Sequence, residues 1–76
     1  MTQSFFKRHS KSFFRGKKAI LLDEHISHAG NKIEKGETVI ILCKNEKYDS
    51  RFDIESVATR VIIRGIICED LELIKE

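Results

Sequence analysis

The sequence predicts a small all-β domain. Three apolar runs rich in β-branched residues follow one another with polar turns between them: Thr38 to Lys44, Arg51 to Val57 and Thr59 to Ile67. This pattern is typical of a three-stranded antiparallel meander. A chain of 76 residues forms one domain. Because a domain of this size buries only about 60% of its unfolded surface, the core is small and leaves little room for a deep active site.

Residues 1–16 are predicted to form a basic, aromatic arm. Winding them as a helix places four ring-bearing side chains on one face and most basic side chains on the other, which is typical of an amphipathic helix. Phe14 falls outside that face, and an isolated helix of about 14 residues is marginally stable. Gly16 is a suitable end for the helix. The sequence is compatible with two states of residues 1–16: a helix docked on the domain and a frayed arm. The face consists of Phe5, Phe6, His9 and Phe13.

The other elements follow in order. The first strand is predicted at Lys17 to Asp23. The segment from Asp23 to Gly36 has no sustained period and contains two glycine turn signals, so we expect a long, folded-back loop that Ile33 anchors to the core. After the meander, a tight turn at Cys68-Glu69-Asp70 precedes a short fifth strand, Leu71 to Ile74.

Alternation within the strands predicts a core face and an outer face. Phe52 and Ile54 of the third strand face the core, and the charged residues between them face water. Gly65 in the fourth strand marks a bulge or a sharp bend. The second and fourth strands are apolar on both faces, so their outer face needs a cover. The outer apolar residues are Ile40, Leu42, Ile62 and Ile66.

Three covers would satisfy this outer face: the bend of a small barrel, the aromatic face of the arm, or a partner chain. Exposed apolar patches of this kind mark interfaces. The residues Ile40, Leu42, Ile62 and Ile66 are therefore candidate contacts with a partner protein or with a second copy of the chain.

The order of these elements resembles that of the SH3-like small β-barrels. The resemblance covers about residues 17–75 and is carried by Ala19-Ile20-Leu21, Lys35-Gly36-Glu37-Thr38-Val39, Val61 to Ile67 and Asp70-Leu71-Glu72-Leu73. It implies a five-stranded barrel at residues 17–76 behind the arm at 1–16, and a tendency to bind ligands without specifying which. Peptide-binding SH3 domains line their groove with aromatics. Here the barrel region offers only Tyr48 and Phe52, so a polyproline site is not expected.

The arm is the first candidate for function because of its charge. Residues 1–18 contain six basic residues and no acid, whereas residues 19–76 contain eight basic and twelve acidic residues. Cations interleaved with aromatics suit nucleic acid, since the cations neutralise phosphates and the rings stack on bases. An anionic membrane surface is less favoured, and a helix that only closes the barrel is the structural alternative. The candidate nucleic-acid contacts are Lys7, Arg8, Lys11, Phe13, Phe14, Arg15, Lys17 and Lys18.

No residue pattern points to catalysis. Cys43 and Cys68 have no paired spacing and are expected to be core thiols in a reducing compartment. The histidines of the long loop, His25 and His28, are expected to be solvated rather than to bind a metal. The carboxylates Asp53 and Glu55, together with Arg51 and Arg60, are expected to form cross-strand ion pairs. We therefore expect no enzyme, cofactor, metal or small-molecule substrate.

The sequence analysis thus predicts a non-catalytic binding or adaptor module. Nucleic acid bound by the arm is the first candidate ligand, and a protein partner or homodimer on the outer apolar face is the alternative. No apolar run approaches the roughly 20 residues that cross a membrane, and the N-terminal segment lacks the apolar centre of a secretory signal. A cytoplasmic location is expected.

Overall fold

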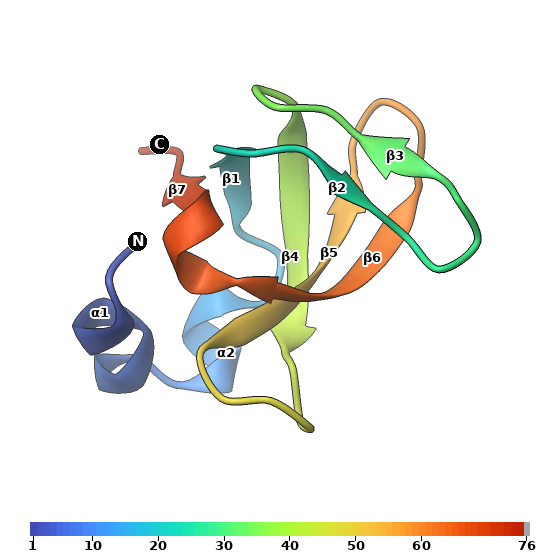
Figure 1. Ribbon diagram of the computed structural model, residues 1–76. Coiled ribbons are helices and arrows are strands. Elements are labelled where there is room, and N and C mark those ends of the chain that lie inside the picture. The colour runs from blue at the N-terminus through green and yellow to red at the C-terminus, as the bar shows by residue number, and fades with distance from the viewer. Residues whose placement is uncertain (76) are drawn as a thin grey trace.

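The computed structural model describes residues 1–75, and most of its regular structure is strand (Figure 1). Five strands form an antiparallel sheet in the order β6-β5-β4-β1-β7, and two short strands form a separate hairpin. All five predicted strands are present. The strands are β1 (Lys18–Leu21), β2 (His25–Ile26), β3 (Lys32–Ile33), β4 (Thr38–Lys44), β5 (Arg51–Ser56), β6 (Ile62–Ile67) and β7 (Leu71–Leu73), and a 3-10 turn, η1 (Cys68–Asp70), precedes β7.

The pairing of the strands produces an open sheet. The predicted meander is β4-β5-β6; β1 pairs with the other side of β4, and β7 returns to pair with β1. β6 and β7 are the two edges, and no ladder joins them within residues 1–75. The small β-rich fold is thus as predicted, whereas the described residues do not close into a barrel. In Figure 1, β6 crosses in front of β4 and leads to η1 on the left, so the sheet is strongly bent.

A bulge at Gly65 changes which residues of β6 face the core. Phe52 lies opposite Ile66 and Ile54 opposite Ile63, so β6 has one more residue than β5 between these pairs. Gly65 has a φ of +78°, in the left-handed region that glycine adopts without a steric penalty. The extra residue reverses the alternation. Ile66 is therefore 2% exposed and lies in the core, and its predicted place on the outer face is wrong.

The long loop contains the β2-β3 hairpin, which the sequence analysis did not predict. Ser27 and Asn31 close its turn, since the Ser27 amide donates to the Asn31 carbonyl at 2.8 Å. On β2, His25 Nε2 lies 2.8 Å from Asp70 Oδ2 of η1, and this contact holds the hairpin against the sheet. Ile33 of β3 is fully buried, which confirms its predicted role as the anchor of the loop.

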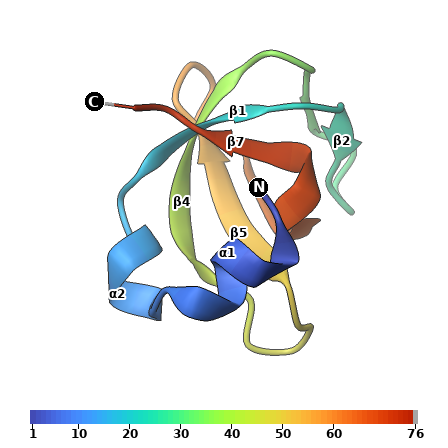
Figure 2. The ribbon, with the colours of Figure 1, turned by 90° about the vertical axis from the view of Figure 1, so that its left-hand side faces the viewer.

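The arm forms two short helices, α1 (Gln3–Arg8) and α2 (Lys11–Phe14), in place of one amphipathic helix. His9 between them has extended backbone angles, and the Ser10 hydroxyl accepts a hydrogen bond from the Phe13 amide as the N-cap of α2. Serine is among the best N-caps and a mediocre residue inside a helix, so the chain starts a second helix there. Figure 2 shows both helices at the same end of β4 and β5.

The arm is docked through its aromatic side chains. Phe6 and Phe14 are buried, and their ring centroids lie 4.9 Å and 4.8 Å from that of Phe52. Lys44 of β4 fixes the end of α1, since its ammonium donates to the carbonyls of Phe6 at 2.8 Å and His9 at 2.7 Å. Because Phe14 is completely buried, the prediction that it stacks on nucleic-acid bases is wrong.

Candidate ligand-binding groove

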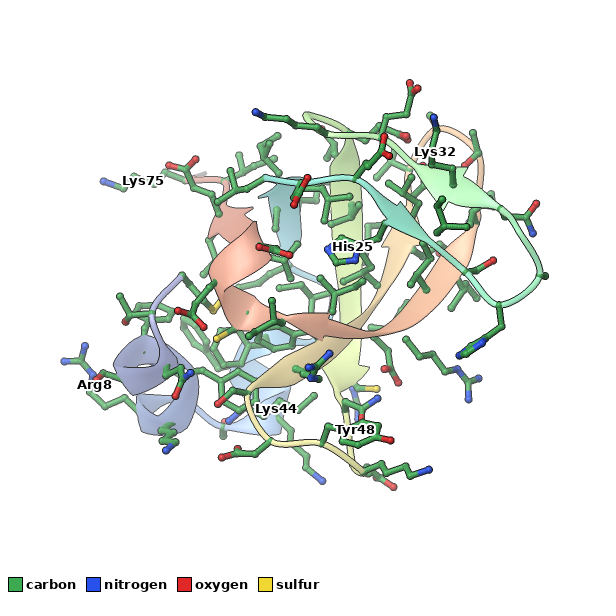
Figure 3. All side chains as sticks on the ribbon, in the orientation of Figure 1. Arg8, His25, Lys32, Lys44, Tyr48 and Lys75 are labelled. Carbon is green, nitrogen blue, oxygen red and sulfur yellow. The ribbon has the colours of Figure 1, made fainter. Side chains whose placement is uncertain are left out.

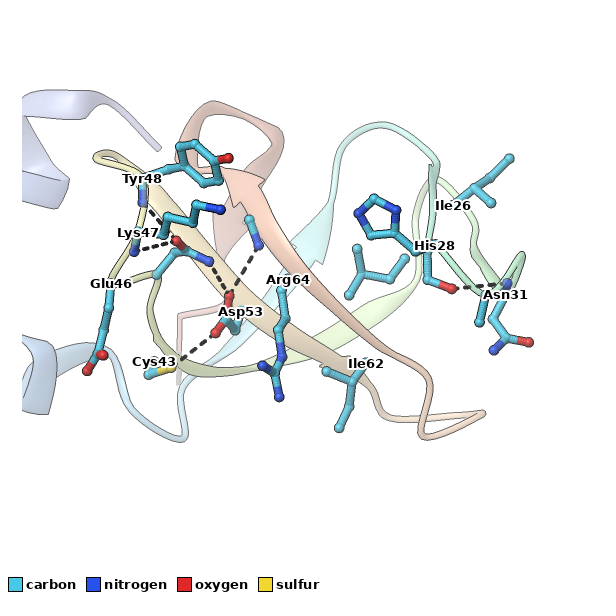
Figure 4. Close-up of a pocket in the computed structure, with 15 residues that line it drawn as sticks. Ile26, His28, Asn31, Cys43, Glu46, Lys47, Tyr48, Asp53, Ile62 and Arg64 are labelled. Atoms are coloured by element: carbon cyan, nitrogen blue, oxygen red, sulfur yellow. Dashed lines mark hydrogen bonds between the residues drawn. The ribbon is translucent and has the colours of Figure 1, made fainter.

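A groove of about 900 Å³ runs between the tip of the β2-β3 hairpin and the loop that joins β4 to β5 (Figure 4). Between these two ends, the residues Ile62 to Gly65 of β6 line the groove. β6 is an edge strand, so alternate backbone amides and carbonyls along its outer side have no partner in the sheet. The groove runs over β6, whose outer edge pairs with no strand within residues 1–75 and lies close to β2.

Three exposed apolar side chains line the groove. Ile26 of β2 is 61% exposed, Tyr48 of the β4-β5 loop is 54% exposed, and Ile62 of β6 is 46% exposed. They come from three separate elements. In Figure 4, Tyr48 lies at one end of the groove and Ile26 at the other, with Ile62 on the β6 side.

A hydrogen-bond network around Asp53 holds the β4-β5 loop in place. Asn45 accepts from the backbone amides of Lys47 and Tyr48, both at 2.9 Å, and its own amide donates to Asp53 at 2.9 Å. The Gly65 amide donates to the same Asp53 oxygen at 3.1 Å. The carboxylate therefore connects the loop to the bulge of β6, so the Tyr48 end of the groove is preorganised.

Cys43 is half-buried and lines the groove, so its predicted place as a core thiol is wrong. Burial raises its pKa above the ordinary value, and the Asp53 carboxylate, which accepts from Cys43 Sγ at 3.5 Å, raises it further. A thiol needs a lowered pKa to act as a nucleophile. Cys68 is buried, and burial raises its pKa as well. The raised pKa values thus disfavour the thiolate form of both cysteines.

The rim of the groove has unpaired positive charge. Within residues 1–75, neither Lys47 nor Arg64 has a carboxylate oxygen within 4.0 Å, whereas Glu46 lies 3.9 Å from Lys11. The Asp53 carboxylate is occupied by the donors described above. The lining therefore carries two cations, Lys47 and Arg64, and two carboxylates, Glu46 and Asp53, and the two cations have no ion-pair partner among residues 1–75.

The predicted nucleic-acid residues separate into two groups on the structure. Lys7 and Lys11 lie about an ion-pair distance from acids of the β4-β5 loop, at 4.0 Å from Asp49 and 3.9 Å from Glu46, and Arg8 points into solvent from α1 (Figure 3). Phe13 is half-buried against His9, with ring centroids 4.0 Å apart. The second group, Arg15, Lys17 and Lys18, lines a separate hollow.

The predicted interface residues do not form one patch. Ile40 and Leu42 are half-buried, Ile66 is in the core, and Ile62 alone contributes to the groove. On the outer face, Ile40 and Ile62 lie on either side of Glu55. The candidate partner surface is therefore the groove rather than the flat sheet.

The carboxylates and histidines that the sequence analysis considered for catalysis or metal binding lie in different surroundings. Glu55 lies 3.9 Å from Arg60, as predicted, whereas Asp53 accepts hydrogen bonds instead of forming the predicted ion pair. His28 lines the groove. Within residues 1–75, no three His, Cys, Asp or Glu side chains are grouped so that they could hold a metal ion.

Sequence analysis missed Ile26 and Tyr48 as groove residues. The one available signal was the turn sequence between Ser27 and Asn31, which places Ile26 next to the tip of a hairpin.

Across residues 1–75, the helices are too short and too polar to span a membrane. Comparison with known protein families, with curated proteins and with solved structures found no match to this chain.

Proposed function

We propose that this chain is a non-catalytic protein-interaction module that binds an extended segment of a partner protein in the groove. The observation that carries the proposal is that Ile26, Tyr48 and Ile62, three exposed apolar side chains from separate elements, are spread along one groove next to the edge strand β6. Exposed apolar side chains gathered in one concave site are typical of binding surfaces.

We also propose an SH3-like architecture. The strand order β6-β5-β4-β1-β7, the long loop after β1 and the single 3-10 turn before β7 support it. Tyr48 is the one aromatic side chain in the groove lining within residues 1–75, which argues against a proline-rich ligand because such ligands dock between several aromatics.

An extended segment matches both parts of the groove. Its backbone would pair with the free edge of β6, and alternate side chains would contact the apolar residues at the groove walls, as in β-strand addition. The free positive charge of Lys47 and Arg64 favours a segment that carries a carboxylate. The proposed ligand is therefore an extended peptide with β-branched or aromatic residues and at least one Asp or Glu.

Peptide selection tests this proposal. A phage-displayed library of random twelve-residue peptides is selected on the full chain, and the enriched peptides are synthesised and their Kd measured by fluorescence anisotropy. We expect peptides of the proposed composition, with affinities weakened at least tenfold by Ile62→Ser or Ile26→Ser. Both side chains are exposed, so these substitutions leave the core intact.

The matched controls are Leu22→Ser and Val57→Ser, which remove exposed apolar side chains outside the groove. They are expected to leave the Kd unchanged within about twofold. The proposal fails if no peptide is enriched, or if the control substitutions weaken binding as much as Ile62→Ser does.

A further inference from the structure

We propose that the chain has a second binding site, separate from the groove, which binds the phosphate backbone of nucleic acid. The site is a hollow of about 450 Å³ lined by Arg15, Gly16, Lys17, Lys18 and Ile74. Three of these five residues are cationic, none is acidic, and none of them lines the peptide groove.

The backbone beneath the three cations is held on both sides. Next to β4, the Gly16 amide donates to the Ile41 carbonyl and the Ile41 amide donates to the Lys17 carbonyl, both at 2.8 Å. Next to β7, the Ile74 amide donates to the Lys18 carbonyl at 3.1 Å. A fixed backbone reduces the conformational entropy that binding costs, so the cations are partly preorganised for an anion.

Gly16 allows the chain to turn between Arg15 and Lys17. Its φ is +82°, and apart from its two chain neighbours no residue has an atom within 4 Å of the position that a Cβ would occupy. The Cα side of this glycine is therefore open, and a phosphate group can lie there between the flanking cations. Arginine offers two parallel N–H donors to a phosphate, and lysine adds a mobile point charge.

The other basic residues of the arm are less suited to this role. Lys7 and Lys11 lie near Asp49 and Glu46, which reduce the local positive potential. Phe14 is buried, and Phe13 packs against His9 on one side and the Lys17 ammonium, 4.5 Å from the ring centroid, on another. The half-buried rings of Phe5 and Phe13 line a neighbouring hollow, whereas the cationic hollow itself is lined by no aromatic ring, so it binds the phosphate backbone without sequence preference.

Two triple variants with equal changes in charge test the site. The first is Arg15→Gln with Lys17→Gln and Lys18→Gln, and the second is Lys7→Gln with Arg8→Gln and Lys11→Gln. The probes are a fluorescein-labelled fifteen-nucleotide oligo-dT and a fifteen-base-pair duplex, titrated with the full chain between 20 and 200 mM KCl.

We expect the wild-type chain to bind both probes. For three phosphate contacts, a slope of about −2 in log K against log salt follows from roughly −0.7 per phosphate on a single strand. The first variant should weaken binding at least tenfold and flatten the slope, and the second should change the Kd by less than about threefold. Circular dichroism of each variant confirms that it is folded, and the single substitution Lys18→Gln, at an exposed position, provides a milder version of the test.

Three results would overturn the proposal. The first is absence of binding by the wild-type chain at 20 mM KCl. The second is equal weakening by the two triple variants, which would assign binding to net charge. The third is binding to vesicles containing 30% phosphatidylserine without binding to either oligonucleotide, which would assign the hollow to a membrane surface.

Discussion

At the scale of single residues, Glu37 shows how a surface carboxylate stabilises a turn. One of its oxygens accepts from the Glu34 amide at 2.7 Å, and the other accepts from the hydroxyl of buried Ser56 at 2.8 Å. The hydrogen bond from the Glu34 backbone, and then the one from Ser56, lower the pKa of Glu37 below 4.5. Because the folded pKa lies below the unfolded one, the stabilisation is complete above pH 4.5 and is lost as the pH falls through the folded pKa.

The substitution Glu37→Gln is therefore expected to reduce the acid sensitivity of folding. Between pH 6 and pH 3, the urea midpoint of the wild-type chain should fall more than that of the variant, because the variant has no carboxylate to protonate at this turn. Glu72→Gln, which removes an exposed carboxylate on β7, is the control and should keep the wild-type pH dependence. Parallel pH profiles for Glu37→Gln and the wild type would contradict this account.

At the scale of elements, the bulge at Gly65 links the bend of β6 to the shape of the groove. The Gly65 amide donates to Asp53, and the Gly65 carbonyl accepts from Arg51 at 2.8 Å. A Cβ at this position would have no neighbour closer than 3.9 Å, so the cost of a side chain is conformational rather than steric. The backbone at Gly65 thus positions the Asp53 carboxylate that also holds Asn45.

Gly65→Ala is expected to destabilise the chain by about 1–2 kcal/mol, the usual cost of a left-handed conformation for a residue with a Cβ. Gly30→Ala is the matched control, because Gly30 has a φ of +86° and open space around it but lies outside the Asp53 network. Both variants should lower the urea midpoint, and only Gly65→Ala should shift the amide NMR signals of Lys47 and Tyr48. If these signals stay in place, the bulge does not organise the groove.

The same elements show what alternation in a sequence can predict. Alternation located all five main strands, because each is at least three residues long and has one face toward the core. It failed after Gly65, since one extra residue in a strand exchanges the two faces. It also missed β2 and β3, each two residues long, because a period of two cannot be detected in two residues.

The candidate sites depend on contacts between distant segments, which local patterns do not describe. Ile62 was predicted to be an exposed interface residue, and it is exposed. Ile26 and Tyr48 join it only because the hairpin folds back and Asn45 fixes the β4-β5 loop. In the arm, a regular helical pattern misplaces Ser10, which caps α2, and Phe14, which packs against Phe52.

At the scale of the whole molecule, the two proposed sites lie on the same five-stranded sheet. The groove and the cationic hollow share no lining residue, so a peptide and a nucleic acid can be bound together. β4 contributes to both, since Cys43 lines the groove and Ile41 holds the backbone of Gly16 and Lys17. With both proposed sites occupied, the chain would connect a protein to a nucleic acid.

This arrangement requires the arm to be part of the cooperative fold, and two neighbouring residues test that requirement. Phe14 is completely buried against Phe6 and Phe52, whereas Phe13 is half-buried. Phe14→Ala is expected to cost about 3–5 kcal/mol, the usual range for truncating a buried phenylalanine. Because a small domain has only about 5–15 kcal/mol of stability, Phe14→Leu provides a milder variant if Phe14→Ala is unfolded. Phe13→Ala should cost clearly less.

Urea unfolding followed both by circular dichroism and by Tyr48 fluorescence gives the measurement. Tyr48 lies in the β4-β5 loop, which Asn45 connects to Asp53 of β5, so its signal reports the loss of the contact between this loop and the sheet. If arm and sheet unfold as one unit, the Phe14 variants lower both midpoints equally, because the loss of packing in the arm is transmitted through Phe52. If the Phe14 variants leave the Tyr48 transition at its wild-type midpoint, the sheet folds without the arm, and the cationic hollow between α2 and β1 is then not a rigid site.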